Sequence, residues 1–474
     1  MTDIDSTATV ADPAARDGVV ATIAERVAAV RAGFAAGVTR PLAWRREQLR
    51  AVERMLRENH EELERAIFSD LGKPPVEGYM TELGPVLTEV KILLKNLEKW
   101  TRPKRVPFMP TLWSRGFIQR EPLGTVLVIA PWNYPVDLLF MPAVGAIAAG
   151  DAVVLKPSEL APATSEVLAR LVPQYLDPRA FAVIEGGVAE TTELLDLAWD
   201  HIFYTGNGTV GRIVMAAAAK HLTPVTLELG GKSPVWIDPS ADIAKAAQWL
   251  TWGKFLNTGQ TCVAPDYVMT TREMQPKLVA ALKTEIANFY GNDPRSNPDY
   301  GRIVNERHAA RLAALIDGAE IALGGEVDVQ TRYVAPTLLV DVEMTDPVMQ
   351  EEIFGPVLPI VPVAGIDAAI ARINAGDKPL ALYVFSQSDG PVEAILDRTS
   401  SGSVAINASM IQLGVDTLPF GGVGGSGMGS YHGEKSIEIF SHNRSVLKKA
   451  PGPNPAAMTF PPYTPKKEKL LRSV

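Results

Sequence analysis

Residues 125–130, Thr-Val-Leu-Val-Ile-Ala, open a stretch in which short apolar runs alternate with longer segments of helical spacing as far as residue 229. Five apolar runs predict buried β-strands at residues 125–130, 152–156, 180–184, 201–204 and 225–229. Helical spacing separates them at residues 136–149, 162–175, 189–198 and 209–220. This alternation is typical of an α/β protein with a doubly wound parallel sheet of five strands. Such a sheet binds ligands beyond the carboxyl ends of its strands.

The flanking segments carry other patterns. Residues 20–100 have the apolar spacing of helices. Residues 102–119 are rich in proline and aromatic residues and have a strand-like end at 116–120, which indicates a crossing segment or a hairpin. After Gly231 a second mixed α/β pattern runs to about residue 407, and a glycine-rich loop follows at residues 420–429. The chain therefore holds a second α/β unit.

The composition is that of a globular protein too long for one hydrophobic core. Of the 474 residues, 46% are apolar and 21% are charged. The net charge of −8 argues against nucleic acid as a partner, because nucleic-acid binding requires a basic patch. The single cysteine cannot form an intramolecular disulfide, which fits a reducing compartment and leaves a free thiol to explain.

No targeting signal or membrane anchor is expected. The N-terminus lacks the basic start and the apolar run of a signal peptide. Residues 125–155 are the most apolar stretch, but their prolines and aspartates favour a buried strand and a core helix over a membrane span. We therefore expect a cytoplasmic protein.

A glycine-rich turn, Gly206-Asn-Gly208-Thr-Val-Gly211, matches the G-x-G-x-x-G fingerprint. It follows the fourth predicted strand and opens a helix, whose unpaired N–H groups and positive dipole end would face a phosphate. The alternative is a plain strand-to-helix turn. Gly206 and Gly211 are thus candidate cofactor-binding residues.

Two sets of residues compete for a nucleotide ribose. The fingerprint requires an acid about 20 residues on, and Glu228 lies 17 residues after Gly211. However, this turn follows the fourth strand, so the next strand need not lie beside the ribose. The second strand ends at Lys156, with Ser158 and Glu159 just beyond, where ribose hydroxyls would lie in such a sheet. These three residues could also form a solvated loop.

Three polar residues are candidates for chemistry. Cys262 ends the polar turn Asn257-Thr-Gly-Gln-Thr-Cys262, which suits an accessible nucleophile, or it is a buried thiol that acts as a small hydrophobe. Glu228, between two leucines, suits a general base of raised pKa if it is buried, or it caps a turn. Asn133, in Pro131-Trp-Asn-Tyr-Pro135, could donate to an oxyanion or stabilise its own turn. The six histidines are scattered, and none lies in a Cys–His protease context.

Together these segments resemble the aldehyde dehydrogenase superfamily from about residue 20 to 470. The matching motifs are Pro131–Pro135, Lys156-Pro-Ser-Glu159, Phe203-Tyr-Thr-Gly206, Glu228-Leu-Gly-Gly-Lys-Ser-Pro234, Asn257–Cys262, Glu351-Glu-Ile-Phe-Gly-Pro356 and Leu418-Pro-Phe-Gly-Gly-Val-Gly424. Three segments resemble the class 3 branch of fatty, aromatic and coniferyl aldehyde enzymes: His221-Leu-Thr-Pro-Val-Thr-Leu-Glu228, Cys262-Val-Ala-Pro-Asp-Tyr267 and Ser426-Gly-Met-Gly-Ser-Tyr-His432.

The resemblance implies a covalent mechanism. Cys262 would attack the aldehyde, while Asn133 and the backbone N–H of Cys262 hold the oxyanion. After hydride transfer to a nicotinamide, Glu228 would activate the water that hydrolyses the thioester, so Glu228 is assigned as the base and not as a ribose ligand. Glu352 would position the nicotinamide ribose, and Phe354 would pack near the ring.

The resemblance also implies the cofactor. Lys156, Ser158 and Glu159 would hold the adenosine ribose. NAD is predicted because the Glu159 carboxylate would repel a 2′-phosphate, and NADP is the alternative, since class 3 relatives with this segment often accept both. No metal is predicted. Gly208, which precedes Thr209, departs from the family pattern of Thr or Ser near the second glycine of the turn.

The same resemblance gives the domains and partners. Residues 20–101 and 122–229 form the NAD(P)-binding domain, residues 230–429 form the catalytic domain, and 102–121 with 430–474 form an oligomerisation element, so that a homodimer is expected. Residues 1–19 are a flexible N-terminus.

The expected substrate is a hydrophobic aldehyde, aromatic or of medium to long chain. Candidate pocket walls are Tyr134, Leu138, Trp252, Phe255 and Met410. Two rival hypotheses are a CoA-acylating relative and a non-enzymatic binding protein. Retention of Glu228 argues against the first, because acyl transfer to CoA needs no water-activating base. The intact set of Cys262, Glu228 and Asn133 argues against the second.

Overall fold

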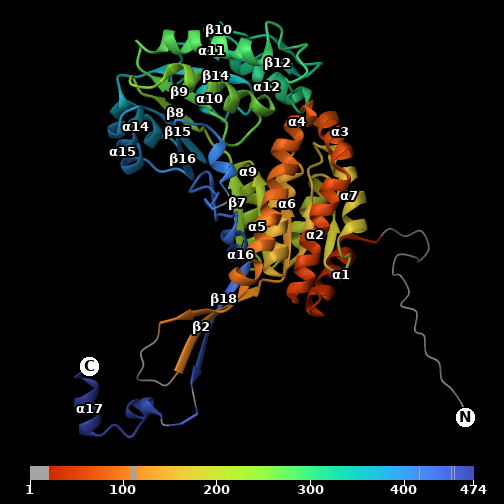
Figure 1. Cartoon of the computed structure of the whole chain (residues 1–474), viewed down its shortest axis with the longest axis vertical. Coiled ribbons are helices and arrows are strands. Elements are labelled where there is room, and N and C mark those ends of the chain that lie inside the picture. The colour runs from red at the N-terminus through yellow and green to blue at the C-terminus, as the bar shows by residue number, and fades with distance from the viewer. Residues whose placement is uncertain (1–20, 108–113, 416, 450, 453, 474) are drawn as a thin grey trace, which may run out of the picture.

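The structure is a computed structural model that describes residues 21–107, 114–415, 417–449, 451–452 and 454–473. The predicted flexible segment, residues 1–19, lies outside these ranges. Two β-sheets with covering helices form the main bodies, and a narrow three-stranded sheet projects from one of them (Figure 1).

A six-stranded sheet carries the alternating pattern of residues 125–229. Its strand order is β17-β7-β6-β3-β4-β5, and the neighbouring pairs from β7 to β5 are all parallel. The five predicted strands are confirmed as β3 (Thr125–Ile129), β4 (Ala152–Lys156), β5 (Phe181–Val183), β6 (His201–Gly206) and β7 (Val225–Leu229). The chain runs from β3 to β5 and then crosses back to β6 beside β3. This reversal is the topological switch point at which such sheets bind ligands.

The glycine-rich segment expected as a loop also contributes a strand. β17 (Gly427–Met428) pairs antiparallel with β7, with Gly427 opposite Glu228. Gly427 has a φ of +143°, and a Cβ there would lie 2.1 Å from the Leu227 carbonyl oxygen, so only glycine permits this close approach. The five-stranded expectation is thereby corrected to a parallel set of five with a sixth, antiparallel edge strand.

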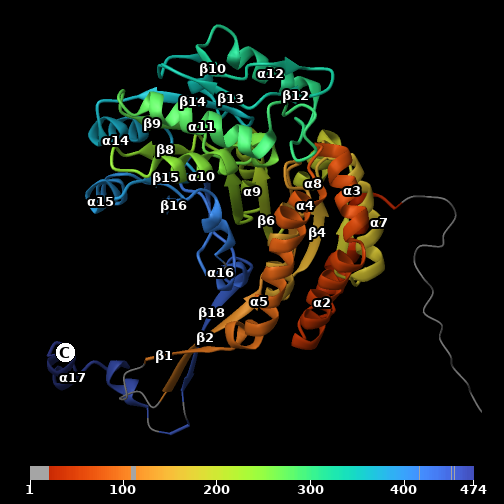
Figure 2. The same cartoon turned by 45° about the horizontal axis from the view of Figure 1, so that its top comes forward.

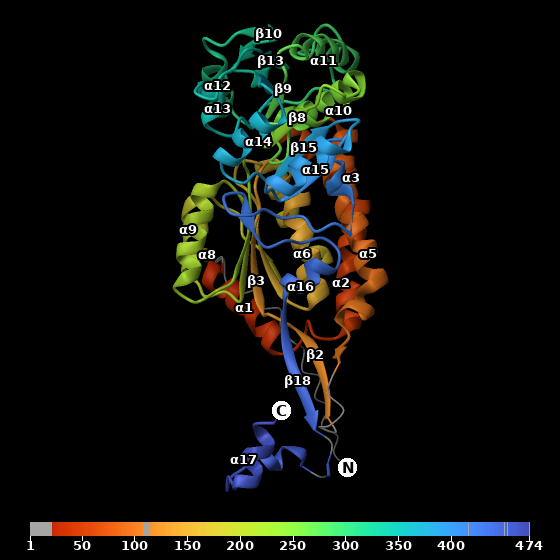
Figure 3. The same cartoon turned by 90° about the vertical axis from the view of Figure 1, so that its left-hand side faces the viewer.

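Helices cover both faces of this sheet. On one face lie α6 and α7 with α2, α3 and α5 behind them; on the other lie α1, α8 and α9 (Figure 3). The bounds are α1 Ile23–Ala35, α2 Leu42–Glu58, α3 His60–Leu71, α4 Pro75–Gly78, a π-helical turn Tyr79–Leu83, α5 Gly84–Thr101, α6 Asp137–Ala149, α7 Pro162–Tyr175, α8 Val188–Asp196, α9 Gly208–Ala219 and α16 Glu434–Ile439. The four helices predicted between the strands are confirmed, with ends shifted by at most two residues.

The second mixed α/β pattern forms a seven-stranded sheet of order β10-β13-β14-β9-β8-β15-β16. All neighbouring pairs are parallel except β10–β13. The strands are β8 Pro234–Ile237, β9 Tyr267–Thr270, β10 Ile321–Leu323, β13 Thr337–Leu339, β14 Val357–Pro362, β15 Ala381–Phe385 and β16 Ser403–Ile406, beside a small hairpin of β11 Val327–Asp328 and β12 Tyr333–Val334. The helices are α10 Ile243–Phe255, α11 Gln275–Tyr290, α12 Glu306–Ile316, α13 Pro347–Gln350, α14 Ile366–Ala375 and α15 Asp389–Arg398, with 3₁₀ turns at Leu256–Gly259 and Ile411–Gly414.

A three-stranded sheet extends away from both bodies (Figures 1 and 2). β1 (Lys104–Val106) and β2 (Ser114–Pro122) pair antiparallel, which confirms the hairpin expected from the proline-rich segment. β18 (Ser441–Lys449) pairs with the whole of β2, and the chain continues through a 3₁₀ turn (Pro455–Thr459) to α17 (Pro465–Leu471). None of the helices in the described ranges has both the length and the apolar character needed to cross a bilayer.

Candidate active site

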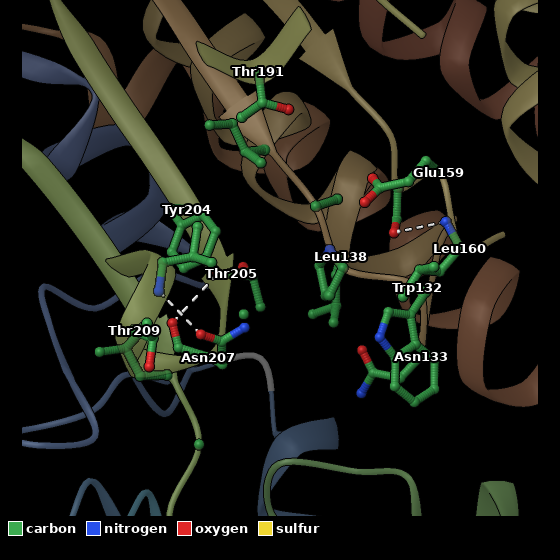
Figure 4. Close-up of a pocket in the computed structure, with 18 of the residues that line it drawn as sticks. Trp132, Asn133, Leu138, Glu159, Leu160, Thr191, Tyr204, Thr205, Asn207 and Thr209 are labelled. Carbon is green, nitrogen blue, oxygen red and sulfur yellow. Dashed lines mark hydrogen bonds between the residues drawn. The ribbon is translucent and has the colours of Figure 1, made fainter. Parts of the chain in front are cut away.

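A cavity of about 700 Å³ lies at the carboxyl edge of the six-stranded sheet. In Figure 4, Trp132 and Asn133 lie across from Tyr204, Asn207 and Thr209. The predicted site residues that line this cavity are Asn133, Lys156, Ser158, Glu159, Gly206, Glu228, Cys262, Glu352 and Phe354. Of the predicted set only Gly211 is absent from the lining: it is buried against Leu229, whose Cδ2 would lie 3.0 Å from an added Cβ. The fold thus gathers residues from six separate segments at one edge.

The strand ends fix one wall of the cavity. Lys156 ends β4 opposite Ile129 of β3, and Glu228 lies in β7 opposite Thr205 of β6. Since β6 and β3 lie between them, Lys156 and Glu228 stand on opposite sides of the switch point. The two sets of residues that competed for a ribose are therefore separated by two strands.

The glycine turn leads into a helix that is capped by an asparagine side chain. α9 begins at Gly208, and the side chain of Asn207 accepts a hydrogen bond from the Val210 N–H (3.0 Å), while the Gly211 N–H donates to the Asn207 carbonyl. The cap takes up the Val210 N–H, and the Gly211 bond is the first bond of the helix itself, so the expectation that the helix start faces a phosphate stays a prediction. Gly206 makes room for the Tyr204 hydroxyl, which would lie 2.2 Å from an added Cβ.

Cys262 follows a turn with an uncommon backbone. Asn257 and Thr258 have φ values of 49° and 54°, and Gly259 has 75°. Cys262 itself is half-buried. Burial raises the pKa of its thiol, and the negative charges of Glu352 and Glu228 raise it further, while hydrogen bonds from the backbone N–H groups of Cys262 and Val263 act in the opposite direction. The raised pKa keeps the thiol of Cys262 protonated when neither cofactor nor substrate is bound.

Asn133 is fixed from both ends. Its side-chain amide donates to the Gln260 carbonyl (3.0 Å). Its own carbonyl accepts from the Lys73 ammonium (3.2 Å) and from the Asn257 side-chain amide (2.8 Å). Because an amide nitrogen carries two hydrogens, the bond to Gln260 leaves a second donor on the cavity residue. The arrangement ties the end of β3 to the turn that carries Cys262.

The two carboxylates whose charge acts on the thiol, the buried Glu228 and the partly buried Glu352, stand in different surroundings. Among the described residues, both carboxylate oxygens of Glu228 lack a hydrogen-bond partner, and burial raises its pKa well above the usual range. Burial, and then the charge of Asp266, raise the pKa of Glu352 to about 8, against a hydrogen bond from the Gly231 N–H. Burial thus disfavours the charged form of both acids, and the free oxygens of Glu228 are placed to accept a proton.

Several residues near the site were not found from the sequence. Lys73 and Glu82 form a fully buried ion pair (2.6 Å), and the Glu82 carboxylate also accepts the N–H groups of Val136 and Asp137 at the start of α6. No local pattern marks this pair, because Lys73 lies in the connection between α3 and α4, Glu82 lies in the π-helical turn, and both meet the site only through the fold. Trp132 also lines the cavity, and it could have been predicted because it stands in the Pro131–Pro135 motif.

Of the five residues expected to form the walls of the substrate pocket, two line a cavity and three do not. Leu138 lines the main cavity, and Trp252 lines a second cavity of about 240 Å³ together with Met80, Leu256 and Phe289. The other three, Tyr134, Phe255 and Met410, are buried side chains that line neither cavity. The Tyr134 hydroxyl bonds Thr261, next to Cys262 (2.5 Å).

Comparison with known proteins agrees with this geometry. The model of the "Aldehyde dehydrogenase family" matches residues 7–446. The chain is 50% identical to mouse aldehyde dehydrogenase family 3 member B2, with 93% of each chain covered, and 50% identical to the rat dimeric NADP-preferring aldehyde dehydrogenase, with 91% of this chain and 95% of the rat protein covered.

Among solved structures, a substrate-bound state of Staphylococcus aureus AldH superimposes with a TM-score of 0.93 at 42% identity, covering 96% of this chain and 99% of the other. Family, fold and sequence identity agree over nearly the whole length. The chain therefore belongs to the aldehyde dehydrogenase family, and it is an NAD(P)-dependent aldehyde dehydrogenase.

Proposed function

We propose that this enzyme oxidises apolar aldehydes to carboxylic acids with Cys262 as the nucleophile, Asn133 as an oxyanion donor and Glu228 as the base. One observation carries the proposal: the free thiol, an amide with a spare hydrogen and a buried carboxylate that has no hydrogen-bond partner in the described part of the chain all line the same cavity. These are the groups that thioester chemistry requires.

The first step is addition of the thiol to the aldehyde. The sulfur of Cys262 bonds to the carbonyl carbon, the electron pair of the carbonyl double bond moves to the oxygen to form an oxyanion, and the thiol proton passes to water. The spare N–H of Asn133 and the backbone N–H of Cys262 stabilise that charge. A single donor of this kind contributes about 10²–10³-fold in rate.

The cavity residues also fit the nucleotide cofactor. Its volume of about 700 Å³ is in the range of cofactor sites. Lys156 and Glu159 face each other at 3.6 Å at the end of β4, and would hold the adenosine ribose with Ser158. Gly230 leaves room for the Glu352 carboxylate, because a Cβ at position 230 would lie 2.1 Å from one of its oxygens. Glu352 would thereby reach the nicotinamide ribose, with Phe354 nearby. When bound, NAD or NADP would supply the acceptor for the hydride that leaves the adduct on Cys262, and loss of that hydride gives the thioester.

Glu228 then supports hydrolysis. Its unpartnered carboxylate takes a proton from water, the water oxygen bonds to the thioester carbon, and the bond from that carbon to the sulfur of Cys262 breaks. The proton then passes from Glu228 to the sulfur, so the products are the carboxylic acid and the regenerated thiol, and Glu228 is again a carboxylate. A pKa raised by burial suits a base that must take a proton near neutral pH.

The substrate class is supported by the apolar surfaces near the site. Leu138 and Trp132 line the main cavity, and the second cavity is formed mainly by apolar side chains, among them Trp252, Phe289 and Met80. Such surfaces favour aromatic or medium- to long-chain aldehydes over small polar ones.

Single-turnover measurements of NADH formation test the mechanism. In Cys262→Ala we expect no burst. In Glu228→Gln we expect a burst of about one NADH per site followed by turnover reduced at least about 10²-fold, because the thioester forms but is not hydrolysed. Added CoA should not restore turnover in the variant. Normal steady-state rates in Cys262→Ala, or strict CoA dependence of the wild-type enzyme, would contradict the proposal.

We also propose that the chain forms a homodimer in the cytoplasm. The three-stranded sheet leaves one long edge of β18 without a paired strand among the described residues, and Leu447 on it is 63% exposed. An unpaired edge invites pairing with another chain. Light scattering after size exclusion should give twice the chain mass, and a truncation after residue 440 should give a monomer; cell fractionation tests the location.

A further inference from the structure

The turn that carries Glu352 is held by charged side chains. The ammonium of Lys232 donates to the carbonyls of Val348 (3.0 Å) and Glu351 (2.8 Å), just before Glu352. The same ammonium forms an ion pair with Asp266. The other carboxylate oxygen of Asp266 accepts the N–H of Ile353 (2.9 Å), just after Glu352. One ion pair therefore bonds the backbone on both sides of Glu352.

A second cation approaches the turn from α12. The guanidinium of Arg311 donates to the carbonyl of Ile353 (2.6 Å) and, more weakly, to that of Glu352 (3.4 Å). It also pairs with the carboxylate of Glu351 (2.9 Å). Three consecutive backbone carbonyls, from Glu351 to Ile353, are thus bonded by cationic side chains.

The turn needs this support because it is strained. Phe354 has a φ of 47°, which is uncommon for an aromatic residue, and such conformations persist only where the surroundings hold them. Its ring packs edge-on against Trp132 at a centroid distance of 5.4 Å, on the wall formed by β3. The backbone of the turn, and with it the direction of Glu352, is set by its neighbours rather than by a helix or strand.

We propose that the Lys232–Asp266 ion pair is a positioning device that sets Glu352 and Phe354 for the nicotinamide end of the cofactor. Lys232 lies four residues after Glu228, and Asp266 lies four residues after Cys262. The pair therefore joins the segments that carry the base, the nucleophile and Glu352. Lys232 and Asp266 touch no reacting atom, and they act through the turn.

This inference rests on the proposed role of Glu352, so Glu352→Gln serves as the reference variant. Lys232→Met and Asp266→Asn each remove one side of the clamp. We expect each to weaken NADH binding, measured by calorimetry, by about 10- to 100-fold, with a matching rise in the KM for NAD. The KM for the aldehyde, and the rate at which iodoacetamide alkylates Cys262 without cofactor, should change by less than about 2-fold. The double variant should bind NADH no more weakly than either single variant, because the two residues act as one unit.

The control is Arg45→Met. Arg45 is also a buried cation bonded to backbone carbonyls, those of Thr39, Arg40 and Ala148, but it lies at the far end of α6 from the site. The Arg45→Met variant should have a lower free energy of unfolding and an unchanged affinity for NADH. If a single clamp variant fails to fold, the double variant, which removes both charges of the pair, replaces it.

The outcomes separate the two proposals. Weakened NADH binding in Glu352→Gln with unchanged binding in both clamp variants overturns the positioning role and leaves Glu352 as the ribose ligand. Weakened binding in the clamp variants alone overturns the role of Glu352 and leaves a clamp that acts on the cofactor through Phe354. Unchanged binding in all three contradicts both.

Discussion

The two walls of the cavity are built in different ways. One wall consists of strand ends, where Lys156, Gly206 and Glu228 occupy positions fixed by the hydrogen-bond register of a parallel sheet. The other consists of the turns at Asn257–Cys262 and Glu351–Phe354, where three non-glycine residues have positive φ. In the first wall the backbone positions the side chains. In the second, side chains position the backbone.

This difference predicts how each wall responds to substitution. A residue at a strand end can be replaced while its neighbours stay in place, because the ladder is made by main-chain groups. In the turns, only a few side-chain amides and charges support the backbone, so the loss of any one of them changes the backbone conformation. The three predictions below test this contrast in order of expected effect.

The largest effect is expected where a charge pair supports the end of a strand. Lys73→Met leaves Glu82 buried without its cation, which should reduce the free energy of unfolding by about 3–5 kcal/mol. It also removes one of the donors to the Asn133 carbonyl, so kcat should fall. Urea unfolding and steady-state kinetics measure the two effects.

The double variant Lys73→Met/Glu82→Gln separates stability from positioning. It removes both charges, so much of the lost stability should return, while kcat should stay below that of the wild type because the carbonyl of Asn133 still lacks the ammonium. Full recovery of kcat would show that the pair matters only for stability.

Glycine-to-alanine substitution should have opposite signs in the two walls. Gly259→Ala places a Cβ 2.3 Å from the Gly355 carbonyl oxygen at a φ of +75°, so strain and overpacking should cost about 2–4 kcal/mol. Gly208→Ala, in the first turn of α9, meets only the flexible end of Arg212 at 3.2 Å and should be neutral or stabilising by up to about 1 kcal/mol. Denaturant unfolding of both variants provides the comparison, and equal losses would refute the contrast between the walls.

The smallest effect concerns the pH dependence of stability. The pKa of Glu228 is raised in the folded protein, so its contribution to stability is greatest below the pKa of the unfolded chain and is lost as pH rises toward the folded value. Glu228→Gln abolishes this loss. Its melting temperature should match that of the wild type at about pH 5 and exceed it at about pH 9, by an amount equivalent to about 1 kcal/mol. The reverse trend would show that Glu228 is stabilised as a carboxylate.

The same contrast explains what sequence reasoning could reach. The strands and helices from residue 125 to 229 follow from the sequence pattern, because the strands are short buried apolar runs, α7, α8 and α9 have one apolar side, and α6 is a longer segment that is apolar all round. The residues at their ends, such as Lys156 and Glu228, could be placed at one edge on that basis alone. Cys262 and Glu352 could not, and they were found through motifs that resemble a family.

The side chains that support the two turns could be predicted neither from periodicity nor from the motifs. Lys73 stands in a helical region with no periodic signal for an ion pair, and its partner Glu82 is nine residues away along the chain. The sixth strand was missed because Gly427 and Met428 form too short a run to show alternation, and their pairing depends on β7, far away in sequence. Long-range contacts of this kind are set by tertiary packing, which a local pattern does not record.

The pairing of β17 with β7 also has a consequence for synthesis of the protein. Glu228 lies opposite Gly427, about two hundred residues later in the chain. While the ribosome is still adding residues 230–426, β7 is an exposed edge strand, and the carboxylate beside it has no final surroundings. Contacts between such distant residues form late in folding because a long loop must close first. A nascent chain can therefore complete its five parallel strands early, yet it acquires the finished site only when nearly all of its sequence has emerged.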